Sequence, residues 1–127
     1  MNYLFVALGG ALGSVLRFWL STQFERRLGE AFPWGTIAVN VTGSFLIGLC
    51  FALKDAAGQP LLGPSARALV IVGVLGGYTT FSAFSLQTLN LFRNGQPGLA
   101  AANILLSVFA CLLAVWLGHL TAQALSR

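Results

Sequence analysis

Four long apolar runs, separated by short polar segments, divide this chain. They cover about residues 3–20, 34–53, 68–92 and 99–120. A helix needs about 20 apolar residues to cross a bilayer. Because hydrocarbon offers no partner for the backbone, each run is predicted to be a helix that satisfies its own hydrogen bonds. We therefore expect an all-α membrane protein, with residues 1–127 forming a single four-span membrane domain.

Charged side chains are almost absent from these runs. Of the 127 residues, 57% are hydrophobic and 8% are charged, whereas a soluble domain carries about 25% charged residues. Arg17 is the only charged side chain inside a run. It is expected either to snorkel to the interface and organise backbone carbonyls, which we favour, or to raise the local anion potential. No basic residue precedes the first run, which favours a retained helix over a cleaved signal peptide.

The loops carry balanced positive charge. With four spans, both termini and the second loop lie on one side of the membrane. The basic residues of that side are Lys54, Arg67 and Arg127, and those of the other side are Arg26, Arg27 and Arg93. An excess on one side is needed to fix orientation. The balance predicts dual topology and an antiparallel dimer, and a weak bias toward one orientation is the alternative.

The residues of the predicted spans argue against both catalysis and coupled transport. The single histidine, His119, has no nearby acid or nucleophile in the sequence, so no enzyme is predicted. A coupled carrier usually places an acid inside a span, and no predicted span contains one. This argues against exporters of the small multidrug type. Cys50 and Cys111 lie in spans and are interpreted as packing residues.

Several polar side chains inside the spans are candidates for binding an ion. In the second span, Thr36, Asn40 and Ser44 are four residues apart and share a helix face. The Asn40 amide can donate hydrogen bonds to an anion, or it can bond to a neighbouring helix. Asn103 and Ser107 share a face of the fourth span in the same way.

The sharpest feature is the segment GGYTTFSAFS at residues 76–85. Paired glycines and threonines are poor helix formers, so a break in the third span is predicted. Freed carbonyls at such a break can bind a cation, and a half-helix start favours an anion. Phe81 and Phe84 follow on one face. Their ring edges carry the positive side of the aromatic quadrupole, although core packing is the commoner reason for such a pair.

Together these segments resemble the Fluc/CrcB family of fluoride ion channels. The resemblance covers the whole chain and rests on GGALGSVLRF at 9–18, WGTIAVN at 34–40 and GGYTTFSAFS at 76–85. It implies an antiparallel homodimer in the bacterial inner membrane that exports fluoride passively and lowers fluoride toxicity. It also implies a structural sodium ion at the dimer interface. The expected partners are fluoride, lipid and a second copy of the chain, and no nucleic acid is expected.

The resemblance also implies roles for individual residues. The backbone carbonyls of Gly76 and Thr79 match the sodium ligands of the family. The family's pore and span-one positions match Asn40, Phe81, Phe84, Asn103, Ser107 and Arg17. Ser82 is a further expected fluoride contact, because moderate binding at several sites suits conduction.

Two positions depart from the family pattern. Ala83 stands where a threonine is usual, and Gln87 stands where a glutamate is usual. These departures keep open the alternative of a non-conducting partner subunit in a heterodimeric channel. A small multidrug-type exporter is the other alternative. A functional homodimeric channel is the favoured interpretation.

Overall fold

Four long helices build the chain, as the apolar runs predict. The computed structural model describes residues 2–126, and these are helical apart from short connections. The first two spanning helices are α1 (Asn2–Leu28) and α2 (Trp34–Ala52), and the last is α6 (Pro97–Leu125). The third, Pro64–Arg93, is composite. Its parts are α3 (Pro64–Arg67), the π-helix η1 (Ala68–Leu75), α4 (Gly76–Tyr78) and α5 (Phe81–Arg93).

Proline and glycine set most of the helix boundaries. Pro64 and Pro97 occupy first helical positions, where the missing N–H costs nothing. Gly29 follows α1 with φ of 80°, and Gly95 follows α5 with φ of 75°. Both values lie in the left-handed region that glycine adopts without a steric penalty. The helices extend beyond the apolar runs, so α1 also carries Glu25 and its neighbouring arginines.

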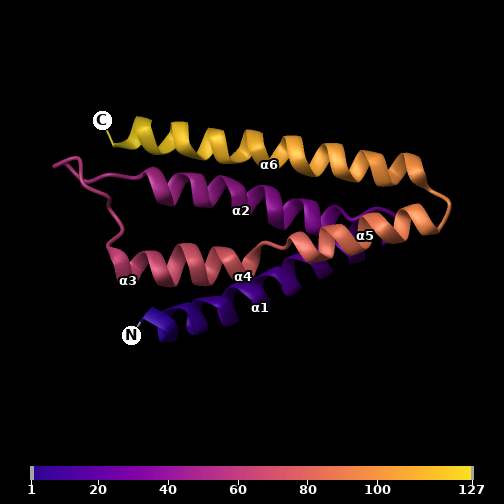
Figure 1. The fold of residues 1–127 in the computed structure, drawn as a ribbon, viewed down its shortest axis with the longest axis horizontal. Helices are drawn as coiled ribbons and strands as arrows, with labels where there is room; N and C mark the ends of the chain where they lie inside the picture. The colour runs from indigo at the N-terminus through magenta and orange to yellow at the C-terminus, as the bar shows by residue number, and fades with distance from the viewer. Residues whose placement is uncertain (1, 127) are drawn as a thin grey trace.

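The helices form a bundle whose chain ends lie together. Figure 1 shows the N-terminus, the C-terminus and the loop between α2 and α3 at one end, with the loop between α5 and α6 at the other. This arrangement agrees with the sidedness used in counting basic residues. Arg127, which belongs to that count, lies outside the described residues. Within the bundle, α2 packs along α6, and α1 packs along η1 and α4.

Glycines allow these helices to approach backbone to backbone. A Cβ at Gly73 would lie 2.9 Å from the Gly9 Cα, and one at Gly77 would lie 3.0 Å from the Gly10 Cα. On the other side of the bundle, a Cβ at Gly118 would overlap the Phe45 carbonyl oxygen of α2. Small residues at such contacts maximise helix packing in a membrane, where apolar burial contributes little.

This packing predicts a sharp difference between two glycines of α6. We expect Gly118→Ala to destabilise the fold by about 1–3 kcal/mol, because backbone atoms cannot move aside easily. Gly98→Ala is the matched control, since a Cβ there meets open space. Thermal unfolding in detergent, followed by size-exclusion chromatography, measures both. Equal stability of the two variants would contradict the close packing of α2 on α6.

The predicted break in the third span is confirmed, and its position is defined by two residues. Thr79 (φ −82°, ψ 159°) and Thr80 (φ −154°, ψ 119°) are extended, and they separate α4 from α5. The Thr80 side chain then caps the new helix, accepting a hydrogen bond from the Ala83 N–H at 3.2 Å. The sequence did not predict that Ala68–Leu75 would form a π-helix, a form associated with functional sites.

Candidate functional site

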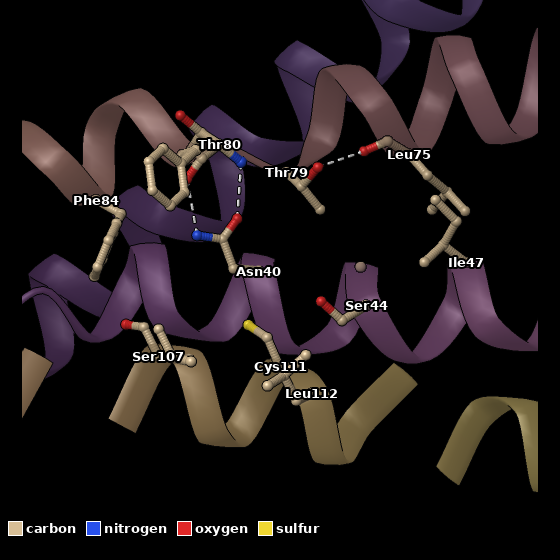
Figure 2. A pocket seen from close by; sticks show the side chains of 13 residues that line it. Asn40, Ser44, Ile47, Leu75, Thr79, Thr80, Phe84, Ser107, Cys111 and Leu112 are labelled. Atoms are coloured by element: carbon tan, nitrogen blue, oxygen red, sulfur yellow. Dashed lines mark hydrogen bonds between the residues drawn. The ribbon is translucent and has the colours of Figure 1, made fainter. Parts of the chain in front are cut away.

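Asn40 of α2 is bonded to the break in the third span on both sides of its amide. Its Oδ1 accepts a hydrogen bond from the Thr80 N–H at 2.7 Å, and its Nδ2 donates one to the Thr80 carbonyl at 2.9 Å (Figure 2). The side chain thus replaces the helical partners that Thr80 lacks. Since the amide nitrogen carries two hydrogens, the second is left for another acceptor. Asn40 can therefore bond to the neighbouring helix and still donate a hydrogen bond to an anion, which are the two roles considered from the sequence.

Two further contacts join α2 to the break. Thr42 donates its hydroxyl hydrogen to the Ala38 carbonyl at 2.7 Å, so in its 2.8 Å bond with Tyr78 the tyrosine hydroxyl is the donor. A Cβ at Gly43 would overlap the Thr79 methyl group. Asn40, Thr42 and Gly43 therefore hold Tyr78 and the two residues of the break against one stretch of α2.

A cavity of about 440 Å³ lies beside the break, between α2, α5 and α6. It is mostly apolar, with hydroxyl and amide groups and two phenyl rings placed along its wall (Figure 2). Its lining consists of Asn40, Gly43, Ser44, Ile47, Leu75, Thr79, Thr80, Phe81, Phe84, Ser107, Val108, Cys111 and Leu112. The Phe81 and Phe84 ring centroids are 5.3 Å apart with planes tilted by 50°. Such a cavity can present several moderate hydrogen-bond and ring-edge contacts to a small anion.

The cavity brings together several of the residues selected by sequence, namely Asn40, Ser44, Thr79, Phe81, Phe84 and Ser107. It also includes Cys111, which sequence reasoning assigned to packing. Cys111 follows Ser107 by four residues on α6, so helical spacing was the signal that could have identified it.

Other predicted residues lie outside this cavity. Asn103 is 1% exposed and is bonded within the protein. Ser82 is exposed, with its hydroxyl 3.3 Å from the Thr80 hydroxyl. Thr36 is buried in α2, and Arg17 is half-buried near the middle of α1. None of these four lines the cavity.

The carbonyls of Gly76 and Thr79 are free to bind a cation. In a continuous helix the Thr80 N–H would bond to the Gly76 carbonyl, but here it is directed to Asn40. Within residues 2–126 neither carbonyl accepts a hydrogen bond. Carbonyl oxygens suit a hard cation such as sodium. The same part of the chain has no cluster of three or more His, Cys, Asp or Glu side chains that could hold a metal.

A second, more polar cavity of about 520 Å³ lies at the end of the bundle that contains the first loop. It is lined by Gln87, Asn90 and Asn94 from the third span and its end, and by Glu25 and Glu30 from the first span and loop. The Gln87 Oε1 is buried and has no hydrogen-bond partner among the described residues. Gln87 lies one helical turn beyond Phe84, so this cavity adjoins the ring pair along α5.

The fold and its cavities define a class of protein. Four spanning helices, a break at membrane depth and a partly polar cavity beside it are the architecture of a small integral membrane protein that binds or conducts an ion.

The comparisons with known proteins identify the family. Residues 4–119 match the family model described as CrcB-like protein, Camphor Resistance (CrcB). The chain is 52% identical to the fluoride-specific ion channel FluC of Methylocella silvestris, covering 100% of this chain and 97% of the relative. It is 56% identical to the protein of that name in Opitutus terrae (98% and 94% coverage) and 53% identical to that in Rhodospirillum rubrum (100% and 98%). The chain belongs to the CrcB family, and it is a multi-pass protein of the bacterial inner membrane.

Proposed function

We propose that this protein is a fluoride-selective ion channel that exports fluoride passively and so lowers its toxicity to the cell. The observation that carries the proposal is the cavity in which Asn40, Ser107 and the two phenyl rings converge beside the break. Relatives about half identical over nearly the whole chain are named fluoride-specific ion channels, which supports it. The role is that of a channel and not of an enzyme, because conduction makes and breaks no covalent bond.

Fluoride loses strongly bound water when it enters a narrow path, so the protein must offer replacement contacts of moderate strength. The free Asn40 amide hydrogen and the ring edges of Phe81 and Phe84 supply such contacts without a fixed positive charge. Beyond Phe84, the polar cavity at Gln87 provides a hydrated approach from one end of the bundle. The Gln87 amide offers hydrogen-bond donors in this cavity, which Glu25 and Glu30 also line.

The functional unit is a homodimer. In the single chain Phe81 is 77% exposed although it forms part of the cavity wall. An ion path open to lipid on that side would not conduct, so a second copy is needed to close it. The balanced basic residues of the two sides support an antiparallel arrangement with dual topology.

The interface between the two copies of the proposed dimer is also suited to a structural sodium ion. One chain offers two free carbonyls, of Gly76 and Thr79, and hard cations take about six oxygen ligands. A twofold partner would double the carbonyl supply. When bound, sodium would neutralise these carbonyl dipoles and link the two chains. We therefore expect the dimer to be more heat-stable in sodium chloride than in N-methylglucamine chloride.

The test is fluoride efflux from liposomes containing the purified protein, recorded with a fluoride electrode and repeated with chloride. Rapid fluoride loss without chloride loss supports the channel and shows that Ala83 and Gln87 are tolerated. A well-folded protein that releases no fluoride would contradict it. The alternative of a subunit that needs a different partner would then replace it.

Cys111 gives a direct test of whether the cavity is the path. We expect a small neutral thiol reagent, methyl methanethiosulfonate, to reduce fluoride efflux about tenfold or more, because it adds bulk inside a single-file path. Cys111→Ser should remove this sensitivity. Cys50→Ser is the matched control, since Cys50 is also a half-buried thiol in a spanning helix but does not line this cavity. Inhibition that persists in Cys111→Ser would place the path elsewhere.

A further inference from the structure

A partly buried chain of hydrogen bonds joins α6 to α5 just behind the cavity wall. Ser107 contacts the Asn103 Oδ1 at 3.3 Å, and the Asn103 Nδ2 contacts the Thr88 Oγ1 at 2.9 Å. Thr88 in turn lies 2.8 Å from the Phe84 carbonyl. Asn103 is 1% exposed and Ser107 is 6% exposed. Both ends of the chain, Ser107 and Phe84, line the cavity, whereas Asn103 and Thr88 do not.

The direction of each bond follows from counting hydrogens. Thr88 has one hydroxyl hydrogen, and it goes to the Phe84 carbonyl, which can only accept. Thr88 therefore accepts from Asn103, whose amide nitrogen is the donor. The Asn103 oxygen must then accept from Ser107. As a result, Ser107 has no hydrogen left for the cavity, and it presents only lone pairs to an approaching anion.

A reversal of this chain would turn Ser107 into a donor. If the Asn103 amide rotates by half a turn, its oxygen faces Thr88 and its nitrogen faces Ser107. Thr88 can then donate to Asn103, Asn103 can donate to Ser107, and the Ser107 hydrogen is released toward the cavity. Every group keeps a partner in both states, although the Phe84 carbonyl loses the Thr88 hydroxyl. That carbonyl still accepts from a backbone N–H one turn along α5.

We propose that Thr88 is a positioning residue for the anion path, acting through Asn103 to set whether Ser107 donates or accepts. A hydroxyl is the side chain suited to this place, because it can both donate and accept and so pairs with either orientation of the Asn103 amide. The Ser107 contact, at 3.3 Å, is long for a bond between oxygens. Exchanging the hydrogen bond from Ser107 to Asn103 for one from Ser107 to fluoride therefore costs little free energy. Entry of the anion thus drives the reversal. This inference rests on the proposed function.

The first test uses substitutions at Thr88 in the liposome assay. Thr88→Val keeps the shape but removes the hydroxyl, and we expect fluoride efflux to fall about tenfold, as for loss of one buried hydrogen bond. Thr88→Ser should retain near wild-type efflux. Thr121→Val is the control, because Thr121 donates to the Leu117 carbonyl at 2.8 Å in the same manner from an exposed site. Wild-type efflux in the same preparation tests the proposed function separately.

A double-mutant cycle separates positioning from simple destabilisation. In a Ser107→Ala background the chain no longer ends in a hydroxyl, so Thr88→Val should cause no further loss of efflux. Equal loss in both backgrounds would overturn the inference, and so would wild-type efflux from Thr88→Val. The wild-type protein provides a readout that needs no variant to fold. Fluoride, but not chloride, should shift the Asn103 side-chain amide signals in nitrogen-15 NMR spectra, and unshifted signals under conducting conditions would also overturn it.

Discussion

Asn40→Ala is expected to abolish fluoride efflux and to weaken the fold. The substitution removes both bonds to Thr80, at 2.7 and 2.9 Å, and leaves a backbone N–H and C=O without partners next to the break. Each unsatisfied buried group costs about 1–3 kcal/mol, so we expect a loss of about 2–6 kcal/mol in stability. Efflux should fall about 100-fold or more, since the bonds that hold the break and the free amide hydrogen are lost together. Thermal unfolding and liposome efflux measure the two effects.

Asn40→Asp separates the two roles of this side chain. The carboxylate still accepts from the Thr80 N–H, but it repels the Thr80 carbonyl and any anion in the cavity. Gln123→Ala is the control, because Gln123 is an exposed amide on α6 that lines neither cavity. If Asn40→Ala kept both its stability and its efflux, the assignment of Asn40 as the partner of the break would be contradicted.

Most of the fold was predictable because the bilayer imposes strong rules on composition. Apolar runs of helical length, with charges confined to their ends, allow few arrangements. The break was predictable as well, since GGYTT at residues 76–80 combines residues with poor helix propensity. The π-helical form of residues 68–75 was not predictable, because its apolar sequence fits an α-helix equally well.

The partners of individual polar side chains were harder to predict. Spacing placed Asn40 on a helix face, but only the fold shows that it faces Thr80, 40 residues away in the sequence. Asn103 was predicted to face fluoride by analogy of position, yet it lies behind the wall and bonds to Thr88. Thr88 and Cys111 were missed because a lone threonine or cysteine in a span is common, and single-helix spacing does not identify the neighbouring helix.

Replacement of the cavity phenylalanines is expected to be nearly as damaging to conduction as loss of Asn40. Phe84 is 8% exposed and its ring lies 5.3 Å from that of Phe81 between α2 and α6. Isoleucine at either position keeps apolar bulk but removes the positive ring edge. We expect Phe84→Ile and Phe81→Ile each to reduce fluoride efflux about 100-fold, equivalent to about 2.7 kcal/mol in the barrier. Phe92→Ile is the matched control, since Phe92 is a 65% exposed ring on the same helix that lines neither the cavity beside the break nor the polar one.

The direction of any change in chloride efflux distinguishes two explanations of the rings. If the rings bind the anion, isoleucine lowers fluoride efflux and leaves chloride excluded, because the path keeps its width but loses a contact. If the rings only narrow the path, isoleucine leaves fluoride efflux intact and allows chloride to leak.

The two phenylalanine positions also differ in how far a single chain encloses them. Phe84 is enclosed by its own chain, whereas Phe81 is 77% exposed, and only the proposed dimer would close the wall beside it. A folded Phe81 variant that lost efflux would therefore support a path at the face where the proposed dimer brings two chains together.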